Sequence, residues 1–294
     1  MSEKVDILFL INPISGVGKK NVIPEYIDKF LDKTKFNHEI EYTQYRKHGF
    51  EIATKSKDKF NIIVAIGGDG TVNEIGSALI NSSTSLGIIP TGSGNGMARH
   101  LKIPLKIKQA LLTINKLNRI TIDTATVNNI PFIGVCGFGY DAYIAKKFDE
   151  HNKRGFLTYA KLIKQEFSTY KPLTFKVTHQ NKVIERKAFM YCIANSSQFG
   201  NGFTISPKSD LQDGVFEHVF LDEFKFKDMF LMGKQFFTKQ IDNSKFYHKF
   251  DASEDVTIEL LNQDKSIFHI DGEPMEGDSI FTVKIVPNSL HIIC

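Results

Sequence analysis

Three times within its first 100 residues, the chain passes from a short apolar run through a glycine-rich turn into an amphipathic stretch. The three turns read NPISGVGKK at 12–20, GGDGTVNE at 67–74 and PTGSGNGMAR at 90–99. A turn of this kind joins a strand to a helix, and in a parallel sheet all such turns lie at the carboxyl ends of the strands. The repetition therefore predicts an α/β fold whose ligand site lies at one edge of the sheet.

The segments around these turns alternate between strand and helix patterns up to about residue 120. Strands are expected at Val5–Ile11, Glu39–Thr43, Asn61–Ile66 and Leu86–Ile89, and helices at Val22–Leu31, Phe50–Lys57, the segment bearing Val72, Ile75 and Leu79, and Lys106–Leu117. Alternation of this kind is typical of a doubly wound α/β domain, in which helices cover both faces of a parallel sheet.

From about Thr121 the pattern changes to a succession of strands. A hairpin is predicted where Ile122–Val127 and Phe132–Cys136 flank the turn Val127-Asn128-Asn129. Further strands are expected at Leu173–Thr178, Ala188–Ala194, Val215–Leu221, Val256–Leu260, Ile267–Ile270, Ile280–Val286 and Leu290–Ile293, and helices near Leu157–Phe167 and Lys225–Phe237. We therefore predict an α/β domain over residues 1–123 and a β-rich domain over residues 124–294.

Composition and charge restrict the classes of function. The 294 residues carry a formal net charge of +4, which is too small to indicate a nucleic-acid partner but favours a phosphorylated ligand or an anionic membrane surface. No apolar run reaches the ~18 residues of a membrane span, and the N-terminus lacks the features of a signal peptide. Cys136, Cys192 and Cys294 have no metal-ligand spacing and fit a reducing compartment. These features predict a cytoplasmic protein.

The glycine-rich turns have the composition of phosphate-binding loops, because such turns expose backbone N–H groups at the positive end of a helix. One turn of this kind would be explained as a plain tight turn. Three in one domain, each with Ser or Thr among the glycines, indicate a nucleotide site. The site matches neither common class: Gly18-Lys19-Lys20 lacks the Ser or Thr of a Walker A loop, and no turn matches G-x-G-x-x-G with a following acid.

Asp69 lies inside the second of these turns, although a tight turn needs only the glycines. A carboxylate beside phosphate is unfavourable unless a cation lies between them. Mg²⁺ typically uses one or two carboxylates together with substrate phosphates. The aspartate therefore predicts that the ligand is a nucleoside triphosphate with its metal, and not a dinucleotide.

Taken together, these motifs resemble the catalytic domain of the diacylglycerol kinase and sphingosine kinase family of lipid kinases. The resemblance continues through CGFGYDAYIAKKF (136–148), RGFLTYAKLIKQ (154–165), DLQDGVFE (210–217) and IDGEP (270–274), in the order of the family. It implies a phosphofructokinase-like, nucleotide-binding α/β domain joined to a β-sandwich, with the active site in the cleft. ATP and Mg²⁺ are the implied cofactors, and GGDGT itself is shared with NAD kinases and phosphofructokinase-like enzymes.

The resemblance also assigns roles to individual residues. Nucleotide contacts are implied for Asn12, Pro13, Ser15, Gly16, Thr43, Gly67, Gly68, Asp69, Gly70, Thr71, Val72, Asn73 and Thr91. Asp271 and Glu273 match the acidic pair credited with activating the lipid hydroxyl, and Asp69 is the next candidate for that role. Asp123 matches an acid near the metal network, and Asp210, Asp213 and Val215 match a second, structural metal loop.

Three segments also have a simpler, purely structural explanation. Asp213-Gly214 and Asp271-Gly272-Glu273-Pro274 both have the composition of tight turns. If strand geometry continued through the latter, its two acids would face the same side, and either could be the proton acceptor. The segment Phe224–Phe237 could dock on a membrane, but it is apolar on so many sides that a core helix is favoured.

The acceptor of the phosphoryl group is left open by the sequence. Gly92-Ser93-Gly94-Asn95-Gly96 departs from the GT-x-ND of many bacterial diacylglycerol kinases and is closer to the sphingosine and ceramide kinases. We expect a lipid kinase that meets its substrate through peripheral membrane contact, and a homodimer is compatible with this. The alternatives are a kinase of NAD or a sugar phosphate, and a non-catalytic lipid- or nucleotide-binding relative.

Overall fold

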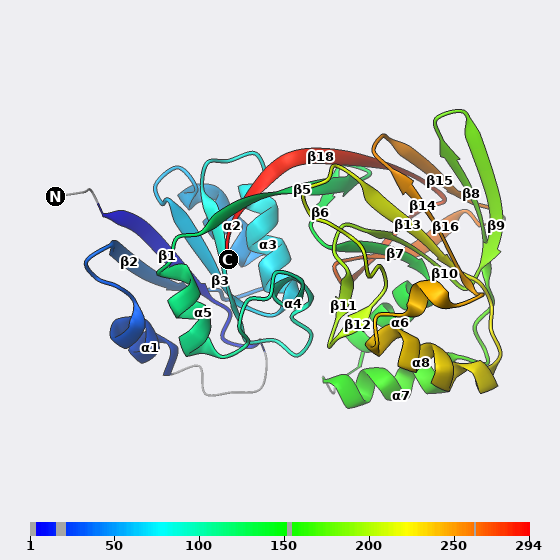
Figure 1. The fold of residues 1–294 in the computed structure, drawn as a ribbon, viewed down its shortest axis with the longest axis horizontal. Helices are drawn as coiled ribbons and strands as arrows, with labels where there is room; N and C mark the ends of the chain where they lie inside the picture. The colour runs from blue at the N-terminus through cyan, green and yellow to red at the C-terminus, as the bar shows by residue number, and fades with distance from the viewer. Residues whose placement is uncertain (1–3, 16–21, 152–154, 262) are drawn as a thin grey trace. The chain divides into compact units, whose positions relative to one another are not determined.

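The computed structural model describes residues 4–15, 22–151, 155–261 and 263–294 (Figure 1). The chain divides into two compact units. Unit 1 runs up to Asp123 and also contains Asn288–Cys294, and unit 2 comprises Thr124–Pro287. The last seven residues, which the sequence analysis places in the second domain, therefore belong to unit 1.

Unit 1 is built on a parallel sheet in the order β2 (Phe36–Tyr42), β1 (Val5–Ile11), β3 (Ile62–Gly67), β4 (Ser85–Pro90). The end of β18 (Ile280–Ile293) adds a further parallel strand beside β4, where Ile292 pairs with Leu86. Every residue of β3 and β4 is buried. Strands covered on both faces require such continuous apolar sequences, which explains why they could be predicted.

Helices lie on this sheet in two pairs (Figure 1). α1 (Ile23–Phe30) packs beside α5 (Ile107–Ile114), and α2 (His48–Ser56) packs beside α3 (Asp69–Leu79). A short helix, α4 (Gly96–His100), precedes α5. Because β2 lies on one side of β1 and β3 on the other, the winding of the chain reverses between β1 and β3. The doubly wound α/β architecture is confirmed, and the reversal marks the place where ligands bind in such sheets.

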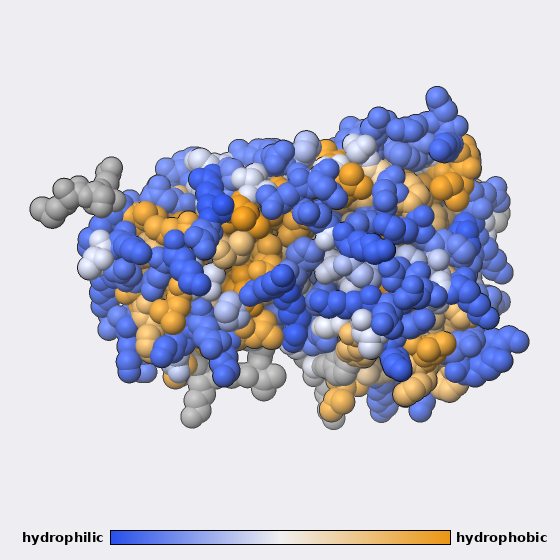
Figure 2. Space-filling view, viewed as in Figure 1, coloured by the Kyte–Doolittle hydropathy of each residue, from blue (hydrophilic) through white to orange (hydrophobic). Residues whose placement is uncertain are grey.

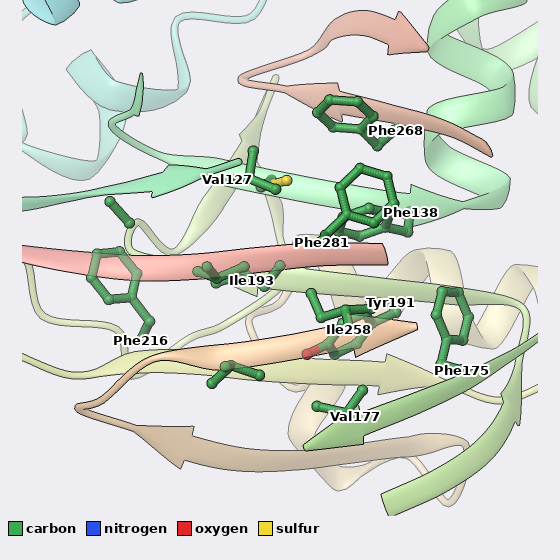
Figure 3. Packing of buried hydrophobic residues seen from close by; sticks show 14 of the residues in the cluster. Val127, Phe138, Phe175, Val177, Tyr191, Ile193, Phe216, Ile258, Phe268 and Phe281 are labelled. Atoms are coloured by element: carbon green, nitrogen blue, oxygen red, sulfur yellow. The ribbon is translucent and has the colours of Figure 1, made fainter. Parts of the chain in front are cut away.

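Unit 2 is a β-sandwich. One sheet has the order β14 (Tyr247–Ala252), β13 (Phe216–Leu221), β10 (Met190–Ala194), β7 (Val135–Gly139), β16 (Lys265–Ile270), β17 (Glu273–Asp278). The facing strands are β9 (Lys182–Ala188), β8 (Leu173–His179), β15 (Val256–Leu260) and the first part of β18. Side chains of both layers form one core, which contains Phe138, Phe175, Tyr191, Phe268 and Phe281 (Figure 3).

The remaining elements of unit 2 surround this sandwich. β5 (Arg119–Val127), which begins in unit 1, and β6 (Ile130–Phe132) form a hairpin at the predicted turn, with Asn128 and Asn129 both at positive φ. The predicted second strand, Phe132–Cys136, is divided between β6 and β7. α6 (Tyr140–Asp149) packs on β16, β17 and α7 (Phe156–Glu166). The other elements are β11 (Gln198–Gly200), β12 (Phe203–Thr204), η2 (Phe226–Asp228), α8 (Met229–Phe237) and η3 (Ile241–Asn243).

Candidate functional site

The glycine-rich turns of unit 1 meet at the carboxyl edge of its sheet. The N–H of Asn12 donates to the carbonyl of Ile66 at 3.0 Å, and the N–H of Thr91 donates to the carbonyl of Gly67 at 2.8 Å. Thr43, which follows β2, donates its N–H to the carbonyl of Ile11 at 2.9 Å. The ends of β1, β2, β3 and β4 are thus tied together at the point where the winding of the sheet reverses.

Side chains from different turns also bind one another at this edge. The amide nitrogen of Asn12 donates to the hydroxyl of Thr71 at 3.0 Å, and the hydroxyls of Ser15 and Thr91 are 3.2 Å apart. The structure therefore brings together four of the residues for which nucleotide contacts were predicted, from the turns after β1, β3 and β4.

The glycines at this edge are required by close approach of the backbone. A Cβ atom at Gly92 would collide with the Cα atom of Gly68, and one at Gly67 would collide with the side chain of Thr71. α3 begins at Asp69, directly after these glycines, so the N–H groups of its first turn point toward the same edge. Such a helix start is a binding place for anions.

Asp69 connects the second and third glycine-rich turns. Its carboxylate accepts hydrogen bonds from the N–H of Asn95 at 2.8 Å and from the N–H of Gly96 at 2.6 Å. The Asn95 side chain in turn bonds to both the N–H and the carbonyl of Gly92, at 3.1 and 2.7 Å. These bonds fasten the second turn to the third, and they place the Asp69 carboxylate at the edge where the glycine-rich turns meet.

The other predicted nucleotide contacts have varied surroundings. Thr43 and Val72 are buried, Pro13 is exposed, and Gly70 and Asn73 are half-buried. Gly16 lies outside the described residues. Asp123, predicted near the metal, is 1% exposed, and its carboxylate accepts the N–H of Asn288 at 2.7 Å. This bond fastens β5 to the end of β18.

The predicted acid pair of unit 2 lies at a tight hairpin turn. β16 and β17 pair up to Ile270 and Glu273, and only Asp271 and Gly272 connect them, at φ +48° and +86°. Two residues at positive φ between antiparallel strands form the turn for which Asp-Gly is a preferred sequence. The tight turn expected from the sequence is therefore present, and the alignment of both acids on one strand face, which required strand geometry to continue through Asp271, does not occur.

Asp271 is engaged with the backbone that precedes β7. Its carboxylate accepts hydrogen bonds from the N–H groups of Ile133, Gly134 and Val135, at 3.0, 2.8 and 2.7 Å. Glu273 is half-buried and begins the next strand. The two acids therefore have different surroundings, which the sequence could not show.

A buried histidine and a half-buried aspartate support this turn, and neither was predicted from the sequence. His269 is 3% exposed, its Nδ1 accepts the N–H of Gly272 at 3.3 Å, and its Nε2 lies 2.9 Å from a carboxylate oxygen of Asp141. Since Nδ1 is an acceptor, we assign the ring proton to Nε2. Gly137 leaves room for this pair, because a Cβ atom there would collide with both side chains. In the sequence, the only indication of a role for Asp141 is its position within the CGFGYDAYIAKKF motif.

Two cysteines lie near Asp141 but are not nucleophiles. The thiol of Cys192 donates to the Asp141 carboxylate at 3.2 Å. Burial and the Asp141 charge raise the pKa values of Cys136 and Cys192 well above the usual range. Both thiols therefore stay protonated near neutral pH, and a thiolate mechanism is excluded for them.

The predicted structural metal loop is held by its own backbone bonds. The carboxylate of Asp210 accepts the N–H of Gln212 at 3.0 Å, and that of Asp213 accepts the N–H of Val215 at 2.9 Å. Within the described residues, no three His, Cys, Asp or Glu side chains gather as a metal cluster. These contacts fit a turn, and a metal at Asp210, Asp213 and Val215 stays a prediction.

Comparison with known proteins agrees with this geometry. The profile described as the diacylglycerol kinase catalytic domain matches residues 6–127, and that of the YegS C-terminal NAD kinase beta sandwich-like domain matches residues 134–294. The chain belongs to the diacylglycerol kinase-like lipid kinase family. A relative in this family, "Probable lipid kinase YegS-like" of Citrobacter koseri, is 28% identical over 78% of this chain and 76% of its own length.

Solved structures with the same fold include one diacylglycerol kinase and one NAD kinase. A diacylglycerol kinase from Bacillus anthracis has a TM-score of 0.76 at 19% identity and covers 100% of this chain and 98% of its own. An NAD kinase from Archaeoglobus fulgidus, solved with ATP, has a TM-score of 0.53 at 11% identity, over 98% of this chain and 93% of its own. In the described part of the chain, no helix is long and apolar enough to cross a bilayer.

Proposed function

We propose that the chain is an ATP-dependent lipid kinase, which transfers the γ-phosphate of ATP to the hydroxyl of diacylglycerol, a sphingoid base or another long-chain lipid. The observation that carries this proposal is the meeting of the glycine-rich turns at the reversal point of the unit 1 sheet, where Asp69 joins two of them. Membership of the lipid kinase family supports it, as does the shared fold with an NAD kinase solved with ATP.

The chain's own groups would bind and orient the phosphates. The N–H groups at the start of α3 would bind phosphate oxygens, and Asn12, Ser15 and Thr91 would offer polar side-chain atoms at the same edge. Asp69 is the residue that would hold Mg²⁺, which needs few protein carboxylates when phosphates complete its ligand set. Bound Mg²⁺ would supply neutralisation of the phosphate charge.

We assign the proton acceptor to Glu273 and a positioning role to Asp271. Three backbone N–H groups donate to the Asp271 carboxylate. These hydrogen bonds fix the turn that precedes Glu273, the first residue of β17. A carboxylate within hydrogen-bond reach of the lipid hydroxyl can accept its proton as the phosphoryl group arrives. His269, through its bond to the Gly272 N–H, would stabilise the same turn from the buried side.

The test is a transfer assay with γ-labelled ATP. The acceptors are diacylglycerol, monoacylglycerol, a sphingoid base, ceramide and undecaprenol, with NAD as the competing small-molecule acceptor. We expect label in one organic-extracted lipid. Label in NAD alone would establish the second candidate function, that of an NAD kinase. The fold shared with a solved NAD kinase supports this candidate. Absence of label from every acceptor would support a non-catalytic relative.

The same assay separates the two acids. Glu273→Gln should lower kcat by about 10²–10⁴-fold with little change in KM for ATP. Asp271→Asn should also lower the unfolding free energy, by roughly 2–3 kcal/mol, because backbone donors lose a charged acceptor. Glu276→Gln is the control, since Glu276 lies on the same strand with its side chain 72% exposed. Full kcat in Glu273→Gln would overturn the assignment.

A further inference from the structure

Helix α8 has two apolar faces: among the described residues, one packs in a core of unit 2, and the other is largely exposed. Met232 and Phe236 are 2% and 5% exposed and belong to a core cluster of unit 2. On the opposite side Phe230 is 86% exposed and Leu231 is 55% exposed. The expectation of a core helix is therefore correct for one face and wrong for the other.

The exposed apolar side chains extend beyond α8. Phe226 on η2 is 54% exposed, and Leu157 on α7 is 84% exposed. The end of α7 packs against η2, since the ring of Phe167 lies 6.1 Å from that of Phe226. Figure 2 shows hydrophobic and hydrophilic side chains side by side over the part of unit 2 where α7 and α8 lie. We call Phe226, Phe230 and Leu231, which lie on η2 and α8 near the end of α7, the α7–α8 apolar surface.

Basic residues are frequent in the segments that carry this surface. Residues 155–171 and 224–240 contain seven lysines and two acids. The seven lysines, all exposed, are Lys161, Lys164, Lys171, Lys225, Lys227, Lys234 and Lys239. Both acids have local partners: Glu166 accepts the Tyr143 hydroxyl at 2.7 Å, and Asp228 accepts the N–H of Lys225 at 3.3 Å. The surface therefore combines apolar side chains with a strong excess of positive charge.

On α8 the two kinds of side chain share one face. Phe230, Lys234 and Phe237 are spaced at i, i+4 and i+7, so they lie in one row along the helix. Rows of aromatic and lysine side chains are typical of helices that lie in a membrane interface, where the rings enter the acyl boundary and the ammonium groups reach the headgroups. A second copy of the chain fits this face less well, because like charges would be brought together.

We propose that the α7–α8 apolar surface docks on a bilayer that contains anionic lipid. This inference rests on the proposed function, because it names the surface through which a kinase with a lipid acceptor would meet its substrate. Apolar insertion and attraction to anionic headgroups act together in such binding. Attraction of the lysines is screened by salt, with a Debye length of ~8 Å at physiological ionic strength.

The test is co-sedimentation of the full chain with vesicles of phosphatidylcholine, with and without phosphatidylglycerol. We expect binding to the anionic vesicles that weakens as salt rises. A double variant with Phe230→Ser and Leu231→Ser should bind these vesicles roughly tenfold or more weakly, since two large apolar side chains no longer insert. Lys227→Glu with Lys234→Glu should abolish the preference for anionic vesicles. Leu112→Ser, at a 42% exposed leucine of unit 1, should bind like the wild type.

Two further measurements make the outcome decisive. Thermal unfolding establishes that the variants fold, and water-dispersed, short-chain forms of the acceptor lipids in the transfer assay measure phosphorylation without a bilayer. Wild-type binding by the Phe230/Leu231 variant, or binding without preference for anionic lipid, would overturn the docking surface. A wild-type dimer that this variant dissolves would show that a second copy covers the surface instead. Failure of the wild type to phosphorylate any of these dispersed lipids would count against the proposed function alone.

Discussion

Asp69 has a structural role in addition to the proposed metal role, and a substitution can separate them. Asp69→Asn removes the charge and one of the two acceptor oxygens that bind Asn95 and Gly96. We expect kcat to fall by at least about 100-fold, the order seen when one key electrostatic group is lost. The control Asn95→Ala disturbs the same loop but keeps the carboxylate. The dependence of the rate on Mg²⁺ concentration should change only in Asp69→Asn. Equal changes in both variants would show that Asp69 acts only by holding the loop in place.

A substitution of Thr91 tests whether the third turn belongs to the proposed nucleotide site. Its hydroxyl lies 3.2 Å from that of Ser15, at the edge where the other turns meet. Thr91→Ala should raise KM for ATP about 2- to 10-fold, the equivalent of one hydrogen bond, and leave KM for the lipid nearly unchanged. Thr91→Ser retains the hydroxyl and should behave like the wild type. A rise in KM for the lipid alone would place this turn at the acceptor site.

At the scale of elements, the contact between the second and third turns depends on glycine. Gly92→Ala would push a methyl group into the backbone of Gly68, which cannot move aside as a side chain can. We expect nucleotide binding to be lost together with thermal stability. Gly233→Ala, in helix α8, is the matched substitution, because a Cβ atom at Gly233 would meet no atom within 4 Å apart from the helix's own backbone. It should be neutral or stabilise by about 0.5–1 kcal/mol. Calorimetry of both variants checks this, and an unaffected Gly92→Ala would show that the turns can separate.

Strands with an apolar run or an apolar alternation were predictable from the sequence, including the partly exposed β8 and β15, and the polar strands β9 and β17 were not. β3 and β4 are continuous apolar runs, whereas β9 reads KVIERKA and β17 reads EPMEGD. β9 and β17 are strands because β8 and β16 pair with them, which is a tertiary effect. The same limit applies to the site: its glycine turns are visible in the sequence, but the bonds from Asp69 to residue 95 and from Asp271 to residue 133 join distant segments.

At the scale of the whole molecule, a buried histidine makes stability depend on pH. Burial, with a smaller contribution from His179, lowers the pKa of His218 from 6.5 to about 3. Between these values the unfolded chain binds a proton that the folded chain does not, so stability is lost as pH falls through this window. The loss is about 2 kcal/mol at pH 5 relative to pH 7.

This prediction is checked by urea unfolding at both pH values. His218→Gln should lose that part of the acid sensitivity, and its amide can still bond to the Tyr191 hydroxyl, which lies 2.6 Å from the His218 ring. His151→Gln, at an exposed histidine, should retain the full sensitivity. Equal acid sensitivity in the wild type and His218→Gln would mean that other groups cause it.

The return of β18 to unit 1 has a consequence for synthesis of the chain. Ile292 pairs with Leu86, so β4 is an edge strand until the final residues arrive. The ribosome synthesises all of unit 2, Thr124–Pro287, after Leu86 and before Ile292. During that interval the backbone groups on the outer side of β4 form an open template for pairing with other chains. Synthesis that pauses in this interval would therefore prolong the exposure of one strand of unit 1 to such pairing.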